Sequence, residues 1–261
     1  MKVTVKTFYD IIDSIAPFET ADTWDNSGLL VGSMDNNVSN VLVALDITEE
    51  VVLEAIENSC QLIISHHPII FTGVMSITEH NYAGKLLQKI IQNNIAVIAA
   101  HTNLDRSTTH GINLFLANEF KLVDCVPLNF AHGYGIVGSL TTSSTLSTFI
   151  ELTKNIFKID LVKISNYQDK PITKVAICSG ASADFIEDAL TNSADVYITG
   201  DLKYHEAQKV LGSGMVLFDV GHFESEFVYL ETLKIHILNQ LQSQNVDIKI
   251  SQYEKPIFRY I

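Results

Sequence analysis

Short apolar runs of strand length alternate with amphipathic helix patterns along most of the 261 residues, and this alternation limits the choice of fold more than any other feature. Alternation of this kind is typical of α/β proteins, in which helices flank the sheets. We expect helices over residues 5–15, 49–59, 83–93, 111–120, 146–157, 183–191, 203–211 and 222–242. We expect strands over residues 41–45, 61–65, 95–100, 174–178, 195–199 and 215–219.

Two adjacent histidines, His66 and His67, directly follow the expected strand at 61–65 and precede Pro68. Open α/β folds place their chemistry at the carboxyl ends of strands. Neighbouring residues of a regular strand point to opposite sides, so such a strand cannot aim both rings at one atom. Two neighbouring metal ions, one for each imidazole, would resolve this geometry. The alternative is a pair of loop histidines that make ordinary hydrogen bonds.

Further chemical groups follow three other strand-like runs: His101 with Asp105, Asp201 with His205, and His222 with Glu226. His222 and Glu226 are four residues apart at the start of an amphipathic run, so they share one face of a helix. That spacing delivers one nitrogen and one carboxylate to a single site, as a metal centre requires. An exposed His–Glu pair at a helix start is the alternative.

For some other polar residues near strand ends, the sequence allows both a functional and a structural role. His101 either orients a ligand or binds substrate, or it caps the strand end. Asp25 and Asn26, after Trp24, either support a site or form an Asx turn. Asp46 ends the first strand and is expected to start a turn. The histidines without a partner pattern are expected to be ordinary residues: His80, His110, His132 and His236.

In their order along the chain, these motifs resemble the Nif-three-like family of dinuclear metal proteins, also called GTP cyclohydrolase I type 2 homologues. The matching segments are 24–32, 65–68, 101–105 with Gly111 and Asn113, 199–205 and 221–226. The family's metal ligands match residue by residue at His66, His67, Asp105, His222 and Glu226. One departure is Ser179–Ser182, where the family has a more glycine-rich turn. Longer members carry an inserted domain for which this chain has no room.

The resemblance implies a metal site in a cleft at the carboxyl ends of the strands of two α/β subdomains. Because His222 and Glu226 must reach His66, we expect residues 1–125 with 222–261 to form the first unit and residues 126–221 the middle one. Pro127 and the turn-rich region 129–138 would mark the crossing. The polar run 141–145 is expected to be a capping loop.

The expected function is that of a dinuclear metal-dependent hydrolase. Three imidazoles and two carboxylates suit two ions of Zn, Fe, Mn, Ni or Co better than Ca or Mg. Water between such ions is acidified towards hydroxide and could open a nucleotide ring, with His101, Asp201 and His205 as catalytic groups. The family label names GTP ring opening with formate release. A phosphoesterase and a non-catalytic metal-dependent binding or regulatory protein are the alternatives.

Charge, hydropathy and cysteine content limit which partners and which location we expect for the protein. The net charge of −13 disfavours extended nucleic-acid binding but permits a small anionic substrate such as a nucleotide at a metal site. No membrane helix is expected, and the N-terminus lacks an apolar signal core, which predicts a cytoplasmic protein. Cys60, Cys125 and Cys178 are expected to be small core residues without a disulfide. The resemblance also implies a ring-like homo-oligomer such as a hexamer.

Overall fold

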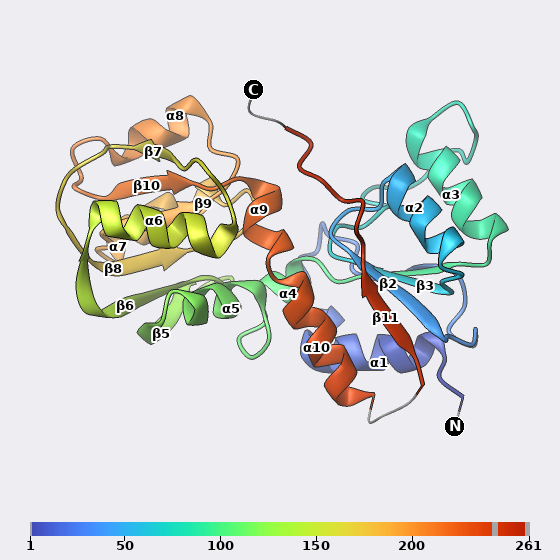
Figure 1. Cartoon of the computed structure of the whole chain (residues 1–261). Helices are drawn as coiled ribbons and strands as arrows, with labels where there is room; N and C mark the ends of the chain where they lie inside the picture. The colour runs from blue at the N-terminus through green and yellow to red at the C-terminus, as the bar shows by residue number, and fades with distance from the viewer. Residues whose placement is uncertain (1, 242–244, 259–261) are drawn as a thin grey trace. The chain divides into compact units, whose positions relative to one another are not determined.

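A computed structural model describes residues 2–241 and 245–258, and the chain divides into two compact units (Figure 1). The first unit is Met1–His110 with Leu230–Ile261, and the second is Gly111–Tyr229. Each has its own sheet flanked by helices, which confirms the predicted α/β class. These bounds differ from the expected 1–125 with 222–261 and 126–221.

In the first unit the strands lie in the order β1-β4-β3-β2-β11. β11, β2, β3 and β4 are parallel, and β1 is antiparallel to β4. The strands are β1 (Gly28–Val31), β2 (Asn40–Ala44), β3 (Leu62–Ser65), β4 (Ala96–Ala99) and β11 (Asp247–Ile250). The helices are α1 (Val5–Ile15), η1 (Phe18–Thr20), α2 (Glu49–Glu57), α3 (Tyr82–Gln92), α4 (Thr102–Asp105) and α10 (Leu230–Gln240).

Helices cover both faces of this sheet (Figure 1). Leu42, Ile63 and Val97 face α2 and α3 and belong to one buried cluster with them. Since strand side chains alternate between faces, Val41 and Ile64, also buried, point to the opposite face, which α1 and α10 cover. α1 forms because its apolar residues recur at helical spacing on one buried face, as the sequence predicts.

In the second unit the strands lie in the order β5-β6-β8-β9-β10-β7. β8, β9 and β10 are parallel, and the other pairs are antiparallel. The strands are β5 (Leu122–Asn129), β6 (Tyr134–Thr145), β7 (Lys163–Ser165), β8 (Pro171–Ile177), β9 (Val196–Thr199) and β10 (Val216–Asp219). The helices are α5 (Ile112–Glu119), α6 (Leu146–Phe157), η2 (Ala183–Phe185), α7 (Ile186–Thr191), α8 (Tyr204–Ala207), η3 (Gln208–Val210) and α9 (His222–Phe227).

Three sequence expectations in the later part of the chain are wrong. Residues 141–145 continue strand β6 instead of forming a loop, because they extend its pairing with β8, although Thr145 caps α6 as expected. The helix expected over 222–242 is two helices, α9 and α10; α9 closes with a hydrogen bond from Tyr229 N to Glu226 O, and residue 242 lies outside the described residues. Cys125 is exposed, whereas Cys60 and Cys178 are buried.

The domain bounds follow from these elements. β5, which contains Pro127, pairs with β6, so the chain enters the second unit before the expected crossing. Proline is tolerated there because β5 is an edge strand among the described strands. α9 directly follows β10 and belongs to the second unit, while α10 belongs to the first, where Gln240 Nε2 donates to Ser14 Oγ at 2.9 Å.

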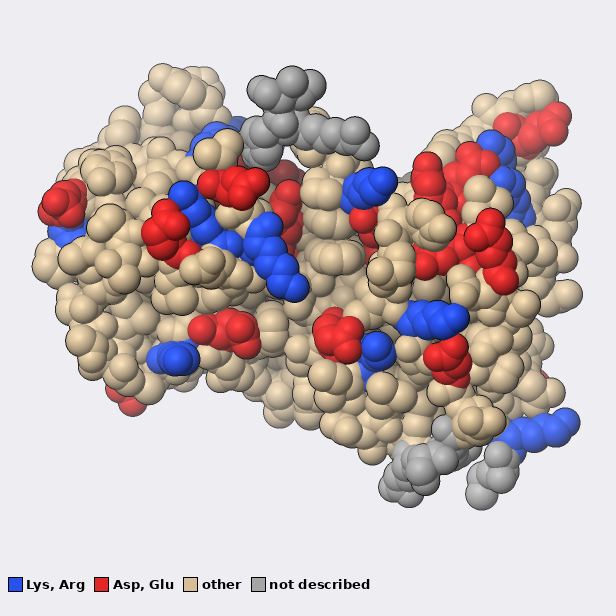
Figure 2. All heavy atoms as spheres, in the orientation of Figure 1, with Lys and Arg blue, Asp and Glu red and all other residues tan. Residues whose placement is uncertain are grey.

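No helix within residues 2–241 and 245–258 has both the length and the apolar character needed to cross a membrane. On the face shown in Figure 2, Lys and Arg side chains lie interspersed with Asp and Glu side chains. This distribution accords with the acidic composition and gives that face no extended basic surface among the residues described.

The segment after β11 binds back to the first unit through two glutamates. Ser251 Oγ and Gln252 N donate to the carboxylate of Glu54 on α2. The carboxylate of Glu254 accepts hydrogen bonds from the backbone N–H groups of Leu45 at 2.8 Å and Asp46 at 2.6 Å, at the end of β2. Burial raises the pKa of Glu254 to about 7, and these two backbone bonds only partly offset the effect.

Glu254 is expected to make the protein less stable as the pH rises. Its folded pKa of about 7 exceeds its ordinary value of 4.5. The folded state therefore binds more protons than the unfolded state between these values, and the free energy of unfolding falls across this window. In urea denaturation, Glu254→Gln should gain roughly 1–3 kcal/mol relative to wild type between about pH 5 and about pH 8. Glu57→Gln, at an exposed position, is the control; equal pH profiles for wild type and Glu254→Gln would contradict the assignment.

Candidate functional site

The two adjacent histidines of the first unit leave the regular strand geometry. β3 ends at Ser65, and His66 N and His67 N donate to consecutive carbonyls, those of Ala44 at 3.1 Å and Leu45 at 2.9 Å. In a regular strand successive N–H groups point in opposite directions, so the chain here has departed from the pleat. The ring centroids of His66 and His67 lie 5.0 Å apart. Neither histidine belongs to a strand, so the limit that regular strand geometry sets on aiming both rings at one atom does not apply to them.

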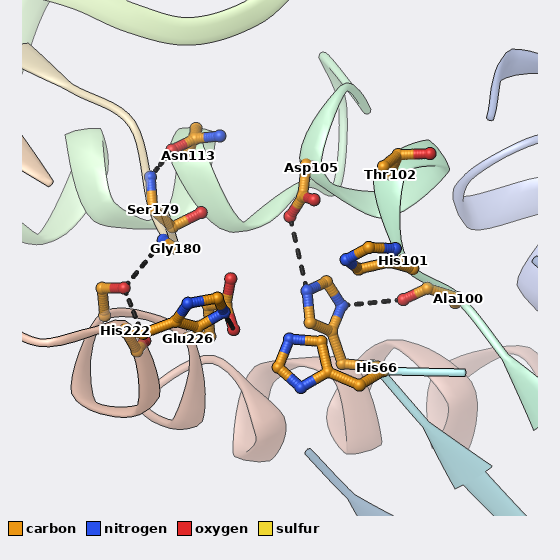
Figure 3. Close-up of polar contacts among 12 residues, drawn as sticks. His66, Ala100, His101, Thr102, Asp105, Asn113, Ser179, Gly180, His222 and Glu226 are labelled. Atoms are coloured by element: carbon orange, nitrogen blue, oxygen red, sulfur yellow. Dashed lines mark hydrogen bonds and ion pairs between the residues drawn. The ribbon is translucent and has the colours of Figure 1, made fainter. Parts of the chain in front are cut away.

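His101 completes a cluster of imidazoles at this edge. It follows β4 and precedes α4, and its ring centroid lies 5.1 Å from that of His66 and 5.4 Å from that of His67. The three rings can offer ligand atoms that all lie within 4.8 Å of one another. One turn along α4, Asp105 Oδ1 lies 3.6 Å from His66 Nε2 (Figure 3). The parallel ends of β3 and β4 thus gather three nitrogens and one carboxylate.

Each imidazole of the cluster is held through its Nδ1 atom by an oxygen acceptor 2.8 Å away: His66 by Ala100 O, His67 by Asp46 Oδ1 and His101 by Asp25 Oδ1. A carbonyl or an ionised carboxylate can only accept, so Nδ1 carries the proton in each ring. In the neutral imidazole, Nε2 then bears the lone pair. Metal-ligating histidines typically have such a carbonyl or carboxylate partner behind them.

Asp25 anchors this arrangement from a position without solvent exposure of its side chain. Besides His101, it accepts hydrogen bonds from the Thr102 hydroxyl at 2.6 Å and the Ser27 hydroxyl at 2.9 Å. Burial alone would raise the pKa of Asp25, but the hydrogen bonds from His101, Thr102 and Ser27 outweigh burial and hold it well below its ordinary value. Asp25 therefore stays ionised and fixes the His101 ring.

The second unit contains a matching group at the end of β10. His222 and Glu226 lie on α9, and His222 Nε2 lies 3.2 Å from Glu226 Oε2. His222 Nδ1 donates to Asp201 Oδ2 at 2.8 Å, which selects the same tautomer as in the first unit. Asp201 follows β9, the parallel neighbour of β10, so the strand ends again bring the pair together. A lone-pair nitrogen facing a carboxylate oxygen is suited to sharing a cation.

The loop after β8 packs closely against this pair. Gly180 N donates to Ser225 Oγ, and Ser179 N donates to Asn113 Oδ1, each at 2.9 Å (Figure 3). Gly180 has a φ of +65°, and a Cβ there would collide with the Glu226 carboxylate. The segment Ser179–Ser182, where the sequence departs from the family pattern, keeps its glycine at the one position that requires it.

Gly180→Ala is expected to displace the Glu226 carboxylate and to weaken metal binding by about 10–100-fold, the range typical of disturbed support around a ligand. Metal content after dialysis against a graded chelator measures this loss. Gly212→Ala is the matched control, because Gly212 has a similar φ of +78° with open space around its position. Equal metal affinity in Gly180→Ala and Gly212→Ala would show that the close approach of position 180 to Glu226 does not affect metal binding.

The remaining predicted residues are placed differently. Asp201 contacts His222. His205 lies on α8, and its Nδ1 atom bonds Gln208 Oε1, just after that helix, at 2.9 Å. Asp46, expected only to start a turn, orients His67. Its position at the end of β2, the neighbour of β3 in the sheet, could have indicated that it lies close to His67. The backbone carbonyl of Ala100 gave no signal, because any residue type carries one.

The donor atoms of both units fit a transition-metal ion. Imidazole nitrogens with carboxylate oxygens suit Zn, Fe, Mn, Ni or Co, whereas Ca and Mg prefer oxygen alone. Within the first unit the three imidazoles are close enough to bind one ion, and in the second unit His222 and Glu226 offer a nitrogen and an oxygen at ligand spacing.

Comparisons with known proteins agree with these motifs. Residues 3–256 match the family model described as Duf34/NIF3 (NGG1p interacting factor 3). A Clostridium perfringens protein named GTP cyclohydrolase 1 type 2 homolog is 34% identical over 257 residues, with 97% of each chain covered. The crystal structure of Staphylococcus aureus hypothetical protein SA1388 superposes with a TM-score of 0.91 at 31% identity, covering 100% of both chains.

Proposed function

This chain belongs to the Duf34/NIF3 family, as its motifs predicted, and we propose that it is a dinuclear metal-dependent hydrolase of a nucleotide. In this proposal His66, His67, Asp105, His222 and Glu226 hold two divalent transition-metal ions. The donors of each unit are ordered by hydrogen bonds within that unit.

The observation that carries the proposal is the common orientation of four histidines. His66, His67, His101 and His222 each direct Nδ1 to a fixed oxygen acceptor at 2.8 Å. Histidines that only pack against their neighbours need not share this Nδ1–oxygen bond at the ends of β3, β4 and β10. The shared tautomer supports a role for His66, His67 and His222 as ligands through Nε2, and in His101 it leaves Nε2 able to accept a proton.

Bound ions would supply Lewis acidity and lower the pKa of a water molecule towards neutrality. The chain's own residues would then orient the substrate and move protons. We assign the role of acid or base to His101, which Asp25 holds in place. Asp201 is proposed to position His222. His205 bonds Gln208, which is not among the proposed ligands, and this favours a lesser role for His205.

The substrate class rests on the relatives. The Clostridium perfringens protein carries the name GTP cyclohydrolase 1 type 2 homolog, which suggests a purine nucleotide opened by water at its imidazole ring. An anionic nucleotide suits a site that gains positive charge from two ions inside an acidic protein.

The test is metal analysis followed by a substrate screen. Protein loaded separately with Zn, Fe, Mn, Ni or Co should bind two ions per chain and release formate from GTP with at least one of them. Turnover of phosphoesters instead of GTP would move the assignment to a phosphoesterase. Stoichiometric metal binding without turnover of any nucleotide or phosphoester would refute the hydrolase and favour a metal-dependent binding protein.

A further inference from the structure

Two aromatic side chains lie in the open beside the imidazole cluster of the first unit. Trp24 is 58% exposed and Phe71 is 46% exposed. Their rings are stacked, with centroids 5.9 Å apart and planes inclined by 24°. Both also meet the His101 ring edge-on, with centroid distances of 6.1 Å for Trp24 and 5.6 Å for Phe71. Aromatic surface is therefore left uncovered next to a residue of the proposed site.

Hydrogen bonds to the neighbouring residues hold the segments that carry these rings in place. Asp25, next to Trp24, is buried and bonded to His101, Thr102 and Ser27. Asn26 Nδ2 donates to Ile70 O at 2.6 Å, which ties this loop to the residue before Phe71. The two rings thus stand on anchored backbone, and their exposure does not come from loosely held side chains.

Fixed and exposed aromatic rings suit a flat partner. A planar heterocycle gains dispersion and electrostatic attraction when it stacks on an aromatic face, and it covers apolar surface that water otherwise contacts. An aliphatic or purely anionic molecule gains little from the same surface. The edge contact of both rings with His101 would bring such a heterocycle next to the group proposed as acid or base.

We propose that Trp24 and Phe71 form a stacking platform for the planar heteroaromatic ring of the substrate. The platform would select a nucleotide over a non-aromatic phosphate of similar charge. This inference rests on the proposed function for its choice of ligand, but it concerns binding and can be measured without turnover.

Trp24 is the one tryptophan of the chain, so intrinsic fluorescence reports on the platform directly. Zn-loaded wild-type protein is titrated with guanosine monophosphate and, in parallel, with ribose 5-phosphate. The first should quench Trp24 emission with saturation, and the second should not. Failure of guanosine monophosphate to bind, or binding without a change in Trp24 emission, would overturn the platform.

Substitutions separate stacking from metal binding. Phe71→Ala should weaken guanosine monophosphate binding about 10-fold in calorimetry, with unchanged metal content and unchanged affinity for ribose 5-phosphate. Trp24→Phe should retain more affinity than Trp24→Ala, because it keeps an aromatic face. Phe130→Ala, at an exposed phenylalanine of the second unit, is the matched control and should bind like wild type.

The two proposals fail in different ways. Normal turnover of GTP with equal nucleotide affinity in wild type, Phe71→Ala and Trp24→Ala would remove the platform and leave the hydrolase. Saturable quenching that Phe71→Ala weakens, in a protein without any turnover, would remove the hydrolase and leave the platform as a binding site.

Discussion

His66→Ala and Asp105→Ala proteins are expected to lose at least one bound ion and all hydrolytic activity while they fold normally. His66 Nε2 and Asp105 Oδ1 lie 3.6 Å apart, and each removed side chain takes one donor from the site. The fold should survive, because the sheet of the first unit is held by its buried apolar faces and not by these polar groups. Metal analysis, circular dichroism and activity on the substrate found in the screen measure the three quantities.

His80→Ala is the control for these variants, because His80 is an exposed histidine of the same unit. It should keep wild-type metal content and activity. Full activity of Asp105→Ala on any substrate that wild type turns over would remove the metal-dependent mechanism. Loss of the folded circular dichroism signal in both variants would instead show that these residues are needed for the fold.

Asp201→Asn is expected to lower metal affinity by about 10–100-fold, because it loosens the orientation of His222. Asparagine tolerates the left-handed backbone at this position, where φ is +53°. Its amide can also present N–H to His222 Nδ1, which would favour the tautomer with the proton on Nε2. The effect should therefore come from the ring and not from backbone strain. Competition with a chelator of known affinity measures it.

His205→Ala provides the comparison for Asp201→Asn. Its ring nitrogen bonds Gln208, so metal affinity should stay within about twofold of wild type, and only turnover could fall. Equal losses of metal affinity in the two variants would show that Asp201 has no special relation to His222.

The sequence predicted which strand ends carry the candidate residues better than it predicted the hydrogen bonds that hold them. Apolar runs followed by polar residues mark strand ends, and parallel ends meet at one edge, so the grouping of His66 with His101 follows from the pattern. The backbone after Ser65 could not be predicted, because consecutive donation to Ala44 and Leu45 depends on where β3 leaves the sheet. The role of Asp25 depends on β1, which the pattern did not reveal.

Three of the strands that the sequence did not indicate, β5, β7 and β11, share a physical reason. β5 buries only two of its eight residues, β7 has three residues, and β11 alternates polar with apolar side chains over one short stretch. Each pairs with a single neighbour among the described strands and has little apolar surface to bury. Their positions are set by pairing with a neighbour, which a local pattern does not contain.

The first unit is discontinuous, and this affects the order in which a growing chain can complete it. Its parallel pair β2 and β11 joins segments that are separated in sequence by the whole of the second unit, so β11 leaves the ribosome after that unit has been made. Contacts between distant segments form only after both have been made. The backbone N–H groups of Leu45 and Asp46 both donate to Glu254 in the segment after β11, and Asp46 in turn orients His67. The histidine cluster is therefore made before the segment that follows β11 and reaches its final support only when that segment arrives.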